Sequence, residues 1–296
     1  MGISRRLALK ALVAAGSTTA AAALGSPRAE GAGLPVAPPD AVGLLYDTTL
    51  CIGCRACVVA CTDANKLRRD TSWSAGKWQA PLDLNAKTKT LIKLYQDGPV
   101  QSFVKQQCMH CIDPACANAC MLGALHKGEF GVVSYDPDLC VGCRYCEMAC
   151  PFNVPKFEWE NATTPQIVKC EMCRDRLAVG KEPACSEVCP RHAVIFGKRT
   201  DLLQEAHRRL DEHPERYIPR VYGETEAGGT QCLYLSHVPF EKIGLPAYGP
   251  TSVPAPQRTL QHGIYQGFAA PVVLYGVLAT VLMRNRKHSD TTEERS

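Results

Sequence analysis

The 296-residue sequence has little of what marks several common classes of protein. Its formal net charge is only +4, and its lysines and arginines are scattered among acids, which argues against a nucleic-acid-binding protein. Aromatic residues make up 7% of the chain and form no stacking platform. It has no glycine-rich dinucleotide loop and no nucleophile paired with a base, so it shows no catalytic constellation. The residue type that is abundant is cysteine, with 17 copies.

Sixteen of these cysteines lie between Cys51 and Cys189, in four groups of four. The first and third groups have the spacing CxxCxxCxxxC, in which three thiolates can wrap three corners of one [4Fe-4S] cube. In two-cluster ferredoxins the fourth cysteine of this run ligates the other cube. Sixteen ligands at four per cube predict four [4Fe-4S] clusters. The groups are Cys51, Cys54, Cys57 and Cys61; Cys108, Cys111, Cys116 and Cys120; Cys140, Cys143, Cys146 and Cys150; and Cys170, Cys173, Cys185 and Cys189.

Structural zinc is the main alternative to iron-sulfur ligation, because a CxxC followed by a second cysteine pair also binds zinc. Zinc explains the first and third groups poorly, since it needs no third cysteine in a CxxCxxC run. A disulfide framework fits less well, because the chain is far longer than the small secreted scaffolds that depend on one. The spacing therefore favours iron-sulfur clusters.

The fold expected between residues 33 and 200 is α+β, with two tandem dicluster modules that resemble bacterial ferredoxins and carry inserts. Each module repeats a strand, a cysteine loop, a short helix and a strand. We expect strands over 42–46, 91–95, 193–196 and 231–236, helices over 55–64 and 201–213, and a hairpin over 124–135. An insert over 63–107 carries Trp73 and Trp78, which either form a docking surface or simply pack over the insert. Cys232, the seventeenth cysteine, is expected to be a buried structural thiol.

Several charged residues lie inside or beside the cysteine groups. They either raise the cluster potentials or keep the surface soluble, and the sequence leaves both open. Two histidines, His110 and His192, also lie there; because every group already has four cysteines, we interpret both as neighbours of the ligands or as surface residues. The charged residues are Lys169, Arg55, Arg144, Arg174 and Arg191.

Residues 1–32 are predicted to be an export signal of the twin-arginine type. Arg5 and Arg6 precede an alanine-rich apolar run that is too short to be read as a membrane span. An ordinary secretory signal with two arginines is the alternative. The twin-arginine route exports folded, cofactor-loaded proteins, which agrees with clusters assembled in the cytoplasm. We therefore expect the body of the protein to lie in the periplasm.

The C-terminal part is expected to hold the protein at the membrane. Residues 201–257 form an extension that ends in a proline-rich tether. Residues 264–283 carry no charge and would span about 30 Å, the thickness of a bilayer core. A tail over 284–296 begins with basic residues, which places it on the cytoplasmic side. A buried soluble helix is the alternative for 264–283.

The order of the groups and the phrases CIGCRACVVAC, CMHCIDPAC, CVGCRYCEMACPFNVPK and CEMC resemble the four-cluster iron-sulfur subunits of membrane-bound respiratory oxidoreductases. In that family the first group pairs with the fourth and the second with the third. The resemblance implies four ligand sets: Cys51, Cys54, Cys57 and Cys189; Cys61, Cys170, Cys173 and Cys185; Cys108, Cys111, Cys116 and Cys150; and Cys120, Cys140, Cys143 and Cys146.

Nearly the whole chain resembles the ferredoxin-like subunit of respiratory [NiFe] hydrogenases of the hydrogenase-2 type. The segments that carry this resemblance are the signal, the GGTQCLYLSHVPFEKIGLP stretch and the HGIYQGFAAPVVLYGVL anchor. It implies a non-catalytic electron-transfer subunit between a hydrogenase small subunit and a multi-span, quinone-reactive membrane subunit. The iron-sulfur subunit of a formate dehydrogenase or another molybdopterin oxidoreductase is the alternative. A zinc-structured membrane scaffold without a redox role is a third hypothesis.

Overall fold

The computed structural model describes residues 36–70, 81, 83–161, 163–256 and 274–282. The predicted signal, Trp73 and Trp78, and most of the predicted membrane span lie outside these residues. Contacts between residues divide the chain into two units, residues 34–254 and a unit made of the two chain ends. In the second unit, residues 274–282 are helical. Among the described residues, no helix is both long enough and apolar enough to span a membrane.

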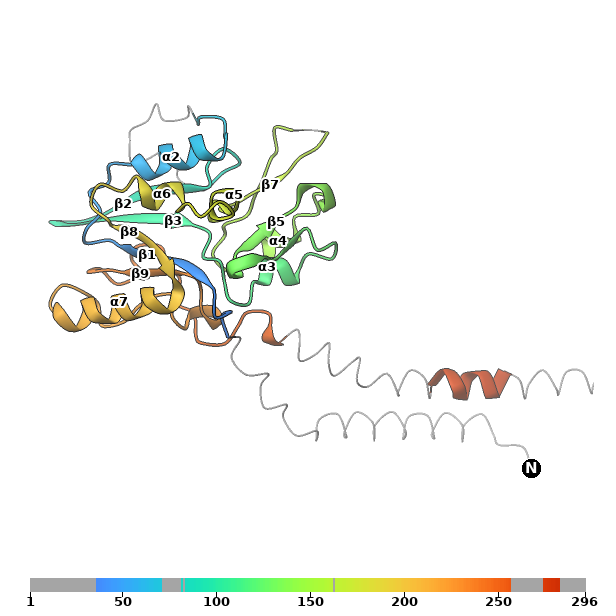
Figure 1. The fold of residues 1–296 in the computed structure, drawn as a ribbon. Coiled ribbons are helices and arrows are strands. Elements are labelled where there is room, and N and C mark those ends of the chain that lie inside the picture. The colour runs from blue at the N-terminus through green and yellow to red at the C-terminus, as the bar shows by residue number, and fades with distance from the viewer. Residues whose placement is uncertain (1–35, 71–80, 82, 162, 257–273, 283–296) are drawn as a thin grey trace, which may run out of the picture. The chain divides into compact units, whose positions relative to one another are not determined.

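The body of the protein, residues 34–254, is built around a three-stranded sheet in the order β8-β1-β9. β1 (Val42–Asp47) pairs antiparallel with β8 (Val194–Lys198) and parallel with β9 (Cys232–Leu235). The helix α7 (Arg199–Glu212) follows β8 directly and covers one face of this sheet (Figure 1). Its apolar side packs there because Leu202 and Ala206 recur four residues apart on one face.

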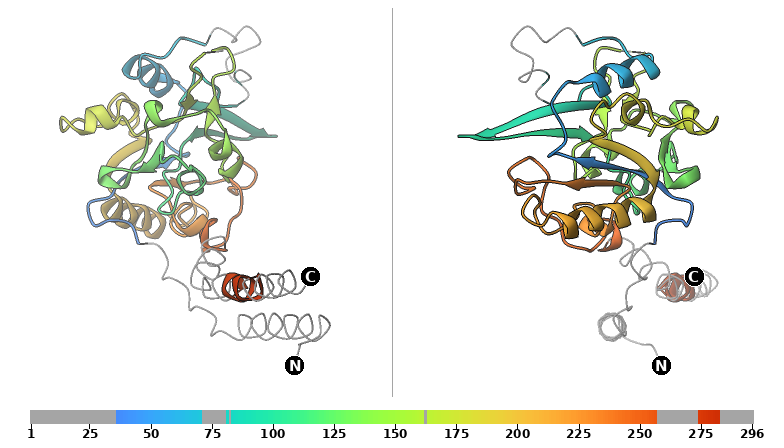
Figure 2. Two further views of the ribbon diagram at one scale, coloured as in Figure 1. Left: turned by 90° about the vertical axis from the view of Figure 1, so that its right-hand side faces the viewer. Right: turned by 60° about the vertical axis from the view of Figure 1, so that its left-hand side comes forward.

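The other side of β1 faces a core to which cysteines contribute. Here β2 (Thr90–Asp97) and β3 (Val100–Gln107) form an antiparallel hairpin, which projects from the body in Figure 2. The helices α2 (Ala56–Ala64) and α6 (Ala184–Glu187) pack against each other. The cysteines buried in this core are Cys57, Cys108, Cys170, Cys185 and Cys232.

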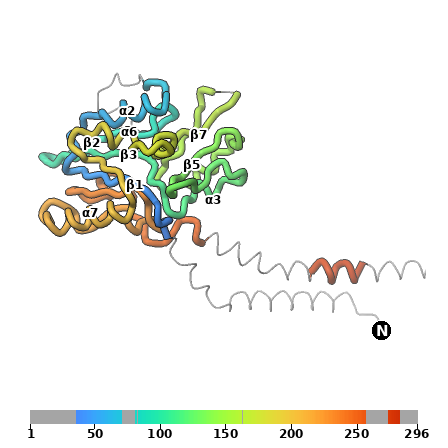
Figure 3. Tube along the Cα trace, viewed as in Figure 1, coloured from blue at the N-terminus to red at the C-terminus, as the bar shows by residue number. Residues whose placement is uncertain are grey.

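A second, smaller group of elements surrounds the middle cysteines. The helices α3 (Ala115–Asn118) and α4 (Tyr145–Ala149) pack together beside the hairpin of β4 (Leu125–Lys127) and β5 (Val133–Tyr135). These elements share a separate apolar cluster. The tube in Figure 3 follows the chain from β1 through this group and back to β8. The second module is therefore nested inside the first. The two modules do not follow one another along the chain, as the prediction of tandem modules implied.

Shorter elements connect these parts of the body. Among the described residues they include the hairpin of β6 (Lys156–Phe157) and β7 (Ile167–Val168), the helix α5 (Arg174–Leu177), and the 3₁₀ turns η2 (Glu129–Gly131), η3 (Pro137–Leu139) and η4 (Glu226–Gly228).

The expected strands over 42–46, 91–95, 193–196 and 231–236 and the expected helices over 55–64 and 201–213 are confirmed to within a few residues. The strand β3 was missed. The proline-rich stretch expected to be a tether packs on the body up to residue 254. Its Ser252 donates a hydrogen bond to Asp113, and its Tyr248 hydroxyl donates to the Pro151 carbonyl at 2.8 Å.

Candidate iron-sulfur sites

The structure brings the sixteen cysteines together in four quartets, each of which joins three cysteines of one group to one cysteine of another. Quartet 1 is Cys51, Cys54, Cys57 and Cys189, which line one cavity. Quartet 2 is Cys61, Cys170, Cys173 and Cys185, which line a second cavity. Quartet 3 is Cys108, Cys111, Cys116 and Cys150, which act on one another electrostatically. Quartet 4 is Cys120, Cys140, Cys143 and Cys146, which line a third cavity.

The first and third cysteine groups fold into the same loop. Gly53 and Arg55 have φ angles of 68° and 62°, and their counterparts Gly142 and Arg144 have 70° and 63°. The two arginines each stand immediately before a helix, α2 or α4, in the left-handed conformation that few residues other than glycine adopt. Such backbone strain is retained where the surroundings determine it, often at functional sites. The sequence repeat is therefore also a repeat of backbone geometry.

A side chain at Gly53 would strain this loop and displace the Phe103 ring. A Cβ added there would lie 2.4 Å from Cε1 of Phe103, in addition to the positive φ. The same turn directs the Gly53 N–H to Cys51 Sγ at 3.4 Å, and in the fourth group the Met172 N–H donates to Cys170 Sγ at 3.3 Å. Backbone donors thus already point at sulfur acceptors in quartets 1 and 2.

Burial and mutual repulsion raise the pKa values of many of these thiols. Burial raises the pKa of Cys185 to about 12, with Cys170, Cys57 and Cys173 contributing in the same direction. In quartet 3, burial and the neighbouring thiolates raise the pKa of Cys116 to about 12. Thiols with such pKa values are protonated at neutral pH, whereas a metal ligand must be the thiolate. Loading of these sites with metal therefore releases protons.

Two fully enclosed lysines stand next to the quartets. Lys105, on β3, has a side chain with no solvent exposure and lines the cavity of quartet 2. Lys169 is 2% exposed and donates to the carbonyls of Val133 and Cys170. Its charge acts on Cys108, Cys116 and Cys150 of quartet 3. The sequence drew attention to Lys169, but nothing in it pointed to Lys105.

The other charged residues beside the cysteine groups divide between the two interpretations that the sequence left open. Arg55 is buried at 6% exposure. Arg144, Arg174 and Arg191 are exposed. The Arg144 guanidinium stacks 4.6 Å from the centre of the Trp159 ring, next to quartet 4. The three exposed arginines therefore fit the interpretation as surface charges. Arg55 and Lys169 lie in the interior, where a charge can affect the clusters.

His110 lies between two cysteines of quartet 3 and is completely buried. Its Nδ1 accepts the Val133 N–H at 3.1 Å, so in the neutral ring the proton is on Nε2. Burial lowers the pKa of His110 well below its usual value, with Lys169 and Lys127 adding to the effect. Its Nε2 has no hydrogen-bond partner among the described residues. A buried donor without an acceptor is costly, and the sulfur atoms of a cluster would supply one. His192, by contrast, is exposed.

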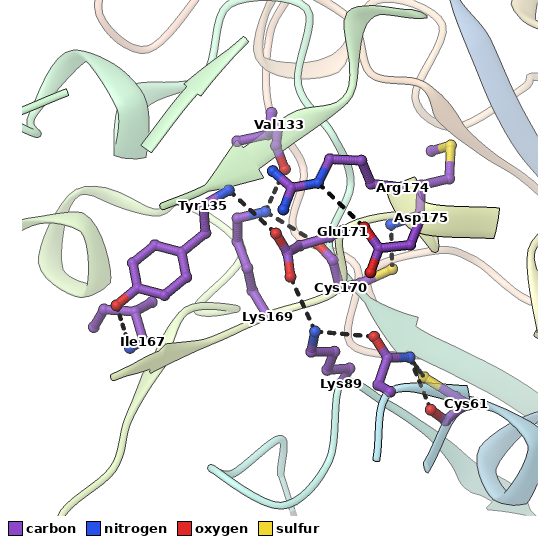
Figure 4. A network of polar contacts seen from close by, with 12 residues as sticks. Cys61, Lys89, Val133, Tyr135, Ile167, Lys169, Cys170, Glu171, Arg174 and Asp175 are labelled. Atoms are coloured by element: carbon purple, nitrogen blue, oxygen red, sulfur yellow. Dashed lines mark hydrogen bonds and ion pairs between the residues drawn. The ribbon is translucent and has the colours of Figure 1, made fainter. Parts of the chain in front are cut away.

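An ion-paired network adjoins quartet 2 (Figure 4). Lys89 Nζ lies 3.0 Å from Glu171 Oε2 and donates to Asn65 Oδ1 at 3.0 Å. Asn65 in turn donates to the carbonyl of Cys61 at 2.8 Å and contacts its Sγ at 3.6 Å. Glu171 also accepts the Tyr135 N–H of β5 at 3.2 Å. The network therefore ties quartet 2 to the nested module.

Cys232 stands apart from the quartets. It is 1% exposed, donates through Sγ to the Cys108 carbonyl at 3.2 Å and accepts from Gln107 Nε2 at 3.4 Å. The prediction of a buried structural thiol is confirmed.

The donor set fits [4Fe-4S] clusters. Within the described residues, no three His, Cys, Asp or Glu side chains are placed to hold a single metal ion. A [4Fe-4S] cube does not require several ligands around one metal ion, because each of its four irons takes one cysteine. Four thiols per quartet, backbone N–H groups directed at sulfur and the orphaned His110 donor all suit a sulfur-rich anionic group.

Comparison with known proteins supports the same assignment. Residues 100–199 match the family model described as a 4Fe-4S dicluster domain. A protein of Nitratidesulfovibrio vulgaris is 46% identical, over 82% of this chain and 67% of its own. The hydrogenase-2 operon protein HybA of Escherichia coli O157:H7 is 38% identical, over 84% and 86%.

The nitrate-inducible formate dehydrogenase iron-sulfur subunit of Escherichia coli K12 is 34% identical to this chain, over 81% of each. Together with the four cysteine quartets, these matches identify the family. The chain belongs to the family of 4Fe-4S dicluster iron-sulfur subunits that includes the hydrogenase-2 operon protein HybA and the iron-sulfur subunits of formate dehydrogenases.

Proposed function

We propose that the protein is a non-catalytic electron-transfer subunit that carries four [4Fe-4S] clusters, one in each of quartets 1 to 4. The observation that carries this proposal is the sorting of sixteen thiols into four sets of four, with none left over and with Cys232 engaged elsewhere. Each set contains three cysteines of one group and one from another group, the arrangement by which two-cluster ferredoxins bind their cubes.

In this proposal the bound clusters supply one-electron transfer, and the chain supplies their surroundings. The cysteine loops hold the thiolates, backbone N–H groups donate to sulfur, and the core around Tyr46 and Tyr234 covers quartet 2 and the inner side of quartet 1. Cys54 and Cys143 are the exposed cysteines, and they belong to quartets 1 and 4. These two quartets are therefore the ones that open to the surface and can exchange electrons with other proteins.

The proposed partners are a periplasmic [NiFe] hydrogenase, through its small subunit, and a multi-span membrane subunit that reacts with quinone. The similarity to HybA over 84% of this chain supports this choice, as does the twin-arginine pattern at Arg5 and Arg6. The alternative partner is a formate dehydrogenase or another molybdopterin enzyme, supported by 34% identity to a formate dehydrogenase subunit.

The test of the partner uses the complex purified anaerobically from native membranes. Hydrogen gas should bleach the visible absorbance of the clusters, and a hydrogenase should co-purify with the chain. Bleaching by formate but not by hydrogen, with a molybdopterin subunit in the complex, would favour the alternative. A purified chain that contains zinc and no iron would contradict both.

We also propose export by the twin-arginine route and anchoring at the periplasmic face of the inner membrane through residues 264–283. The test replaces Arg5 and Arg6 together by lysine and measures where the chain accumulates. It should remain in the cytoplasm with its iron bound. Continued export of the double variant would exclude the twin-arginine route.

A further inference from the structure

Lys105 is a buried cation whose counter-charge is missing from the described part of the chain. Its side chain has no solvent exposure. Its ammonium group donates to two neutral acceptors, Thr90 Oγ1 at 2.5 Å and Gln107 Oε1 at 2.5 Å. An ammonium group has three N–H donors, so one remains without a partner among the described residues. A buried charge is costly unless an opposite charge balances it.

The position of Lys105 shows which negative groups are near. The residue lines the same cavity as all four cysteines of quartet 2. Ile92, its direct partner across the β2–β3 hairpin, lines the cavity of quartet 1 together with Cys57. Lys105 thus lines the cavity of quartet 2 and is the cross-strand neighbour of a residue that lines the cavity of quartet 1.

Around quartet 4, the described residues provide no buried lysine or arginine in the lining of the cavity. The cation that lines its cavity is Arg144, which is exposed and stacks on Trp159 and Phe157. A charge on an exposed side chain is screened by water and salt, whereas a charge in the interior acts with little screening. Lys105 should therefore affect quartets 1 and 2 much more strongly than Arg144 affects quartet 4.

We propose that the Lys105 ammonium group is the shared counter-charge of the clusters in quartets 1 and 2 and that it raises the reduction potentials of both. Reduction adds one negative charge to a cluster, and a fixed positive charge nearby favours that state. Lys105 then acts on both clusters through its buried charge. This inference rests on the proposed function, because it requires clusters in both quartets.

The experiment is an anaerobic redox titration followed by electron paramagnetic resonance on the full-length protein and on Lys105→Gln and Lys105→Arg. Lys93→Gln is the matched control. Lys93 lies on the same hairpin but opposite Val104, so its side chain is on the other face and partly exposed. The signal of quartet 4 is identified by its change in Cys143→Ser. Iron and sulfide are counted in every sample.

Lys105→Gln should lower two of the four midpoint potentials and leave that of quartet 4 unchanged. Lys105→Arg and Lys93→Gln should leave all four near the wild-type values. Loss of two clusters in Lys105→Gln with full iron in Lys105→Arg would also support the proposal, because the charge would then be needed to retain them.

Unchanged potentials in an iron-loaded Lys105→Gln variant would overturn the proposal, as would an equal shift of all four signals. Equal loss of clusters in the Gln and Arg variants would overturn it too, since the cause would then be the shape of the side chain. None of these results affects the proposed function, which fails only if the wild-type protein lacks the clusters.

Discussion

The tripeptide Cys-Glu-Met occurs twice in this chain, and its two copies lie in opposite surroundings. In the copy at Cys170, which belongs to the fourth cysteine group, Met172 lies in the main core and is 0% exposed. In the third group, Met148 follows Cys146 and is 85% exposed. The same three residues thus build the enclosed side of quartet 2 and the open side of quartet 4. Cysteine spacing defines the ligands, but it does not define what surrounds them.

The difference extends beyond the two methionines. Quartet 2 lies beside the buried Lys105 and the Lys89–Glu171 ion pair. Quartet 4 is bordered by exposed apolar residues, Met121, Leu122, Leu139 and Val141. Enclosed clusters are stabilised by interior charge and are remote from water, whereas an open one can meet another protein. We therefore expect the same kind of substitution to reduce the stability of the fold more at quartet 2 than at quartet 4.

The largest effect is expected for Cys185→Ala. Cys185 belongs to quartet 2 and to the main core. Loss of this cluster should lower the iron content by about four atoms per chain and the free energy of unfolding by at least about 4 kcal/mol, because metal binding and folding are coupled. Hydrogen exchange should then show loss of protection in β1. Full iron content in this variant would contradict the quartet assignment.

A smaller effect on the fold is expected for Cys143→Ala at the exposed quartet 4. Iron should again fall by about four atoms per chain, since one cluster loses a ligand. The amides of β1 should keep their protection, because the three-stranded sheet lies in the other module. Equal loss of β1 protection in the Cys143 and Cys185 variants would remove the distinction between the two quartets.

An intermediate effect is expected for Glu171→Gln, which neutralises the partner of Lys89 beside quartet 2. Burial raises the pKa of Glu171, but Lys89 and Lys169 outweigh this and lower it, so the carboxylate is charged and paired. Removal of its charge should cost about 2 kcal/mol, measured by urea unfolding of the anaerobic protein. In the control, Glu160→Gln, the exposed Lys87–Glu160 pair is broken and the unfolding midpoint should not move.

The smallest effect is expected for Met148→Ser on the open side of quartet 4. An exposed substitution of this kind should change the free energy of unfolding by no more than about 0.5 kcal/mol and leave the iron content intact. Met172→Ser is the matched change in the enclosed copy, and it should cost about 3 kcal/mol because it leaves a cavity and buries a hydroxyl. Similar stabilities for the two variants would contradict the comparison.

Much of this architecture could be predicted because it depends on local patterns. The spacing of Cys51, Cys54 and Cys57 predicts a loop around three corners of one site, and the apolar run after Val42 predicts a strand. The helix over 201–213 was readable from Leu202 and Ala206. Such features are encoded within ten or fifteen residues of chain.

The parts that could not be predicted depend on contacts between distant residues. The strand β3 reads QSFVKQQ after its first valine, and its polar residues gave no strand signal, yet Ser102, Lys105 and Gln107 are buried. Lys105 and Gln107 are tolerated inside because other buried groups accept and donate their hydrogen bonds. The parallel pairing of β9 with β1 likewise joins residues almost 190 positions apart, which no local pattern reveals.

The central claim is that all four quartets hold cubes. The most direct measurement is the count of iron and acid-labile sulfide in the full-length protein after anaerobic purification, together with its electron paramagnetic resonance spectrum during reductive titration. Four cubes give about sixteen iron atoms and about sixteen sulfides per chain, with coupled signals from neighbouring clusters. About eight of each, or zinc in place of iron, would contradict the assignment of a cluster to every quartet.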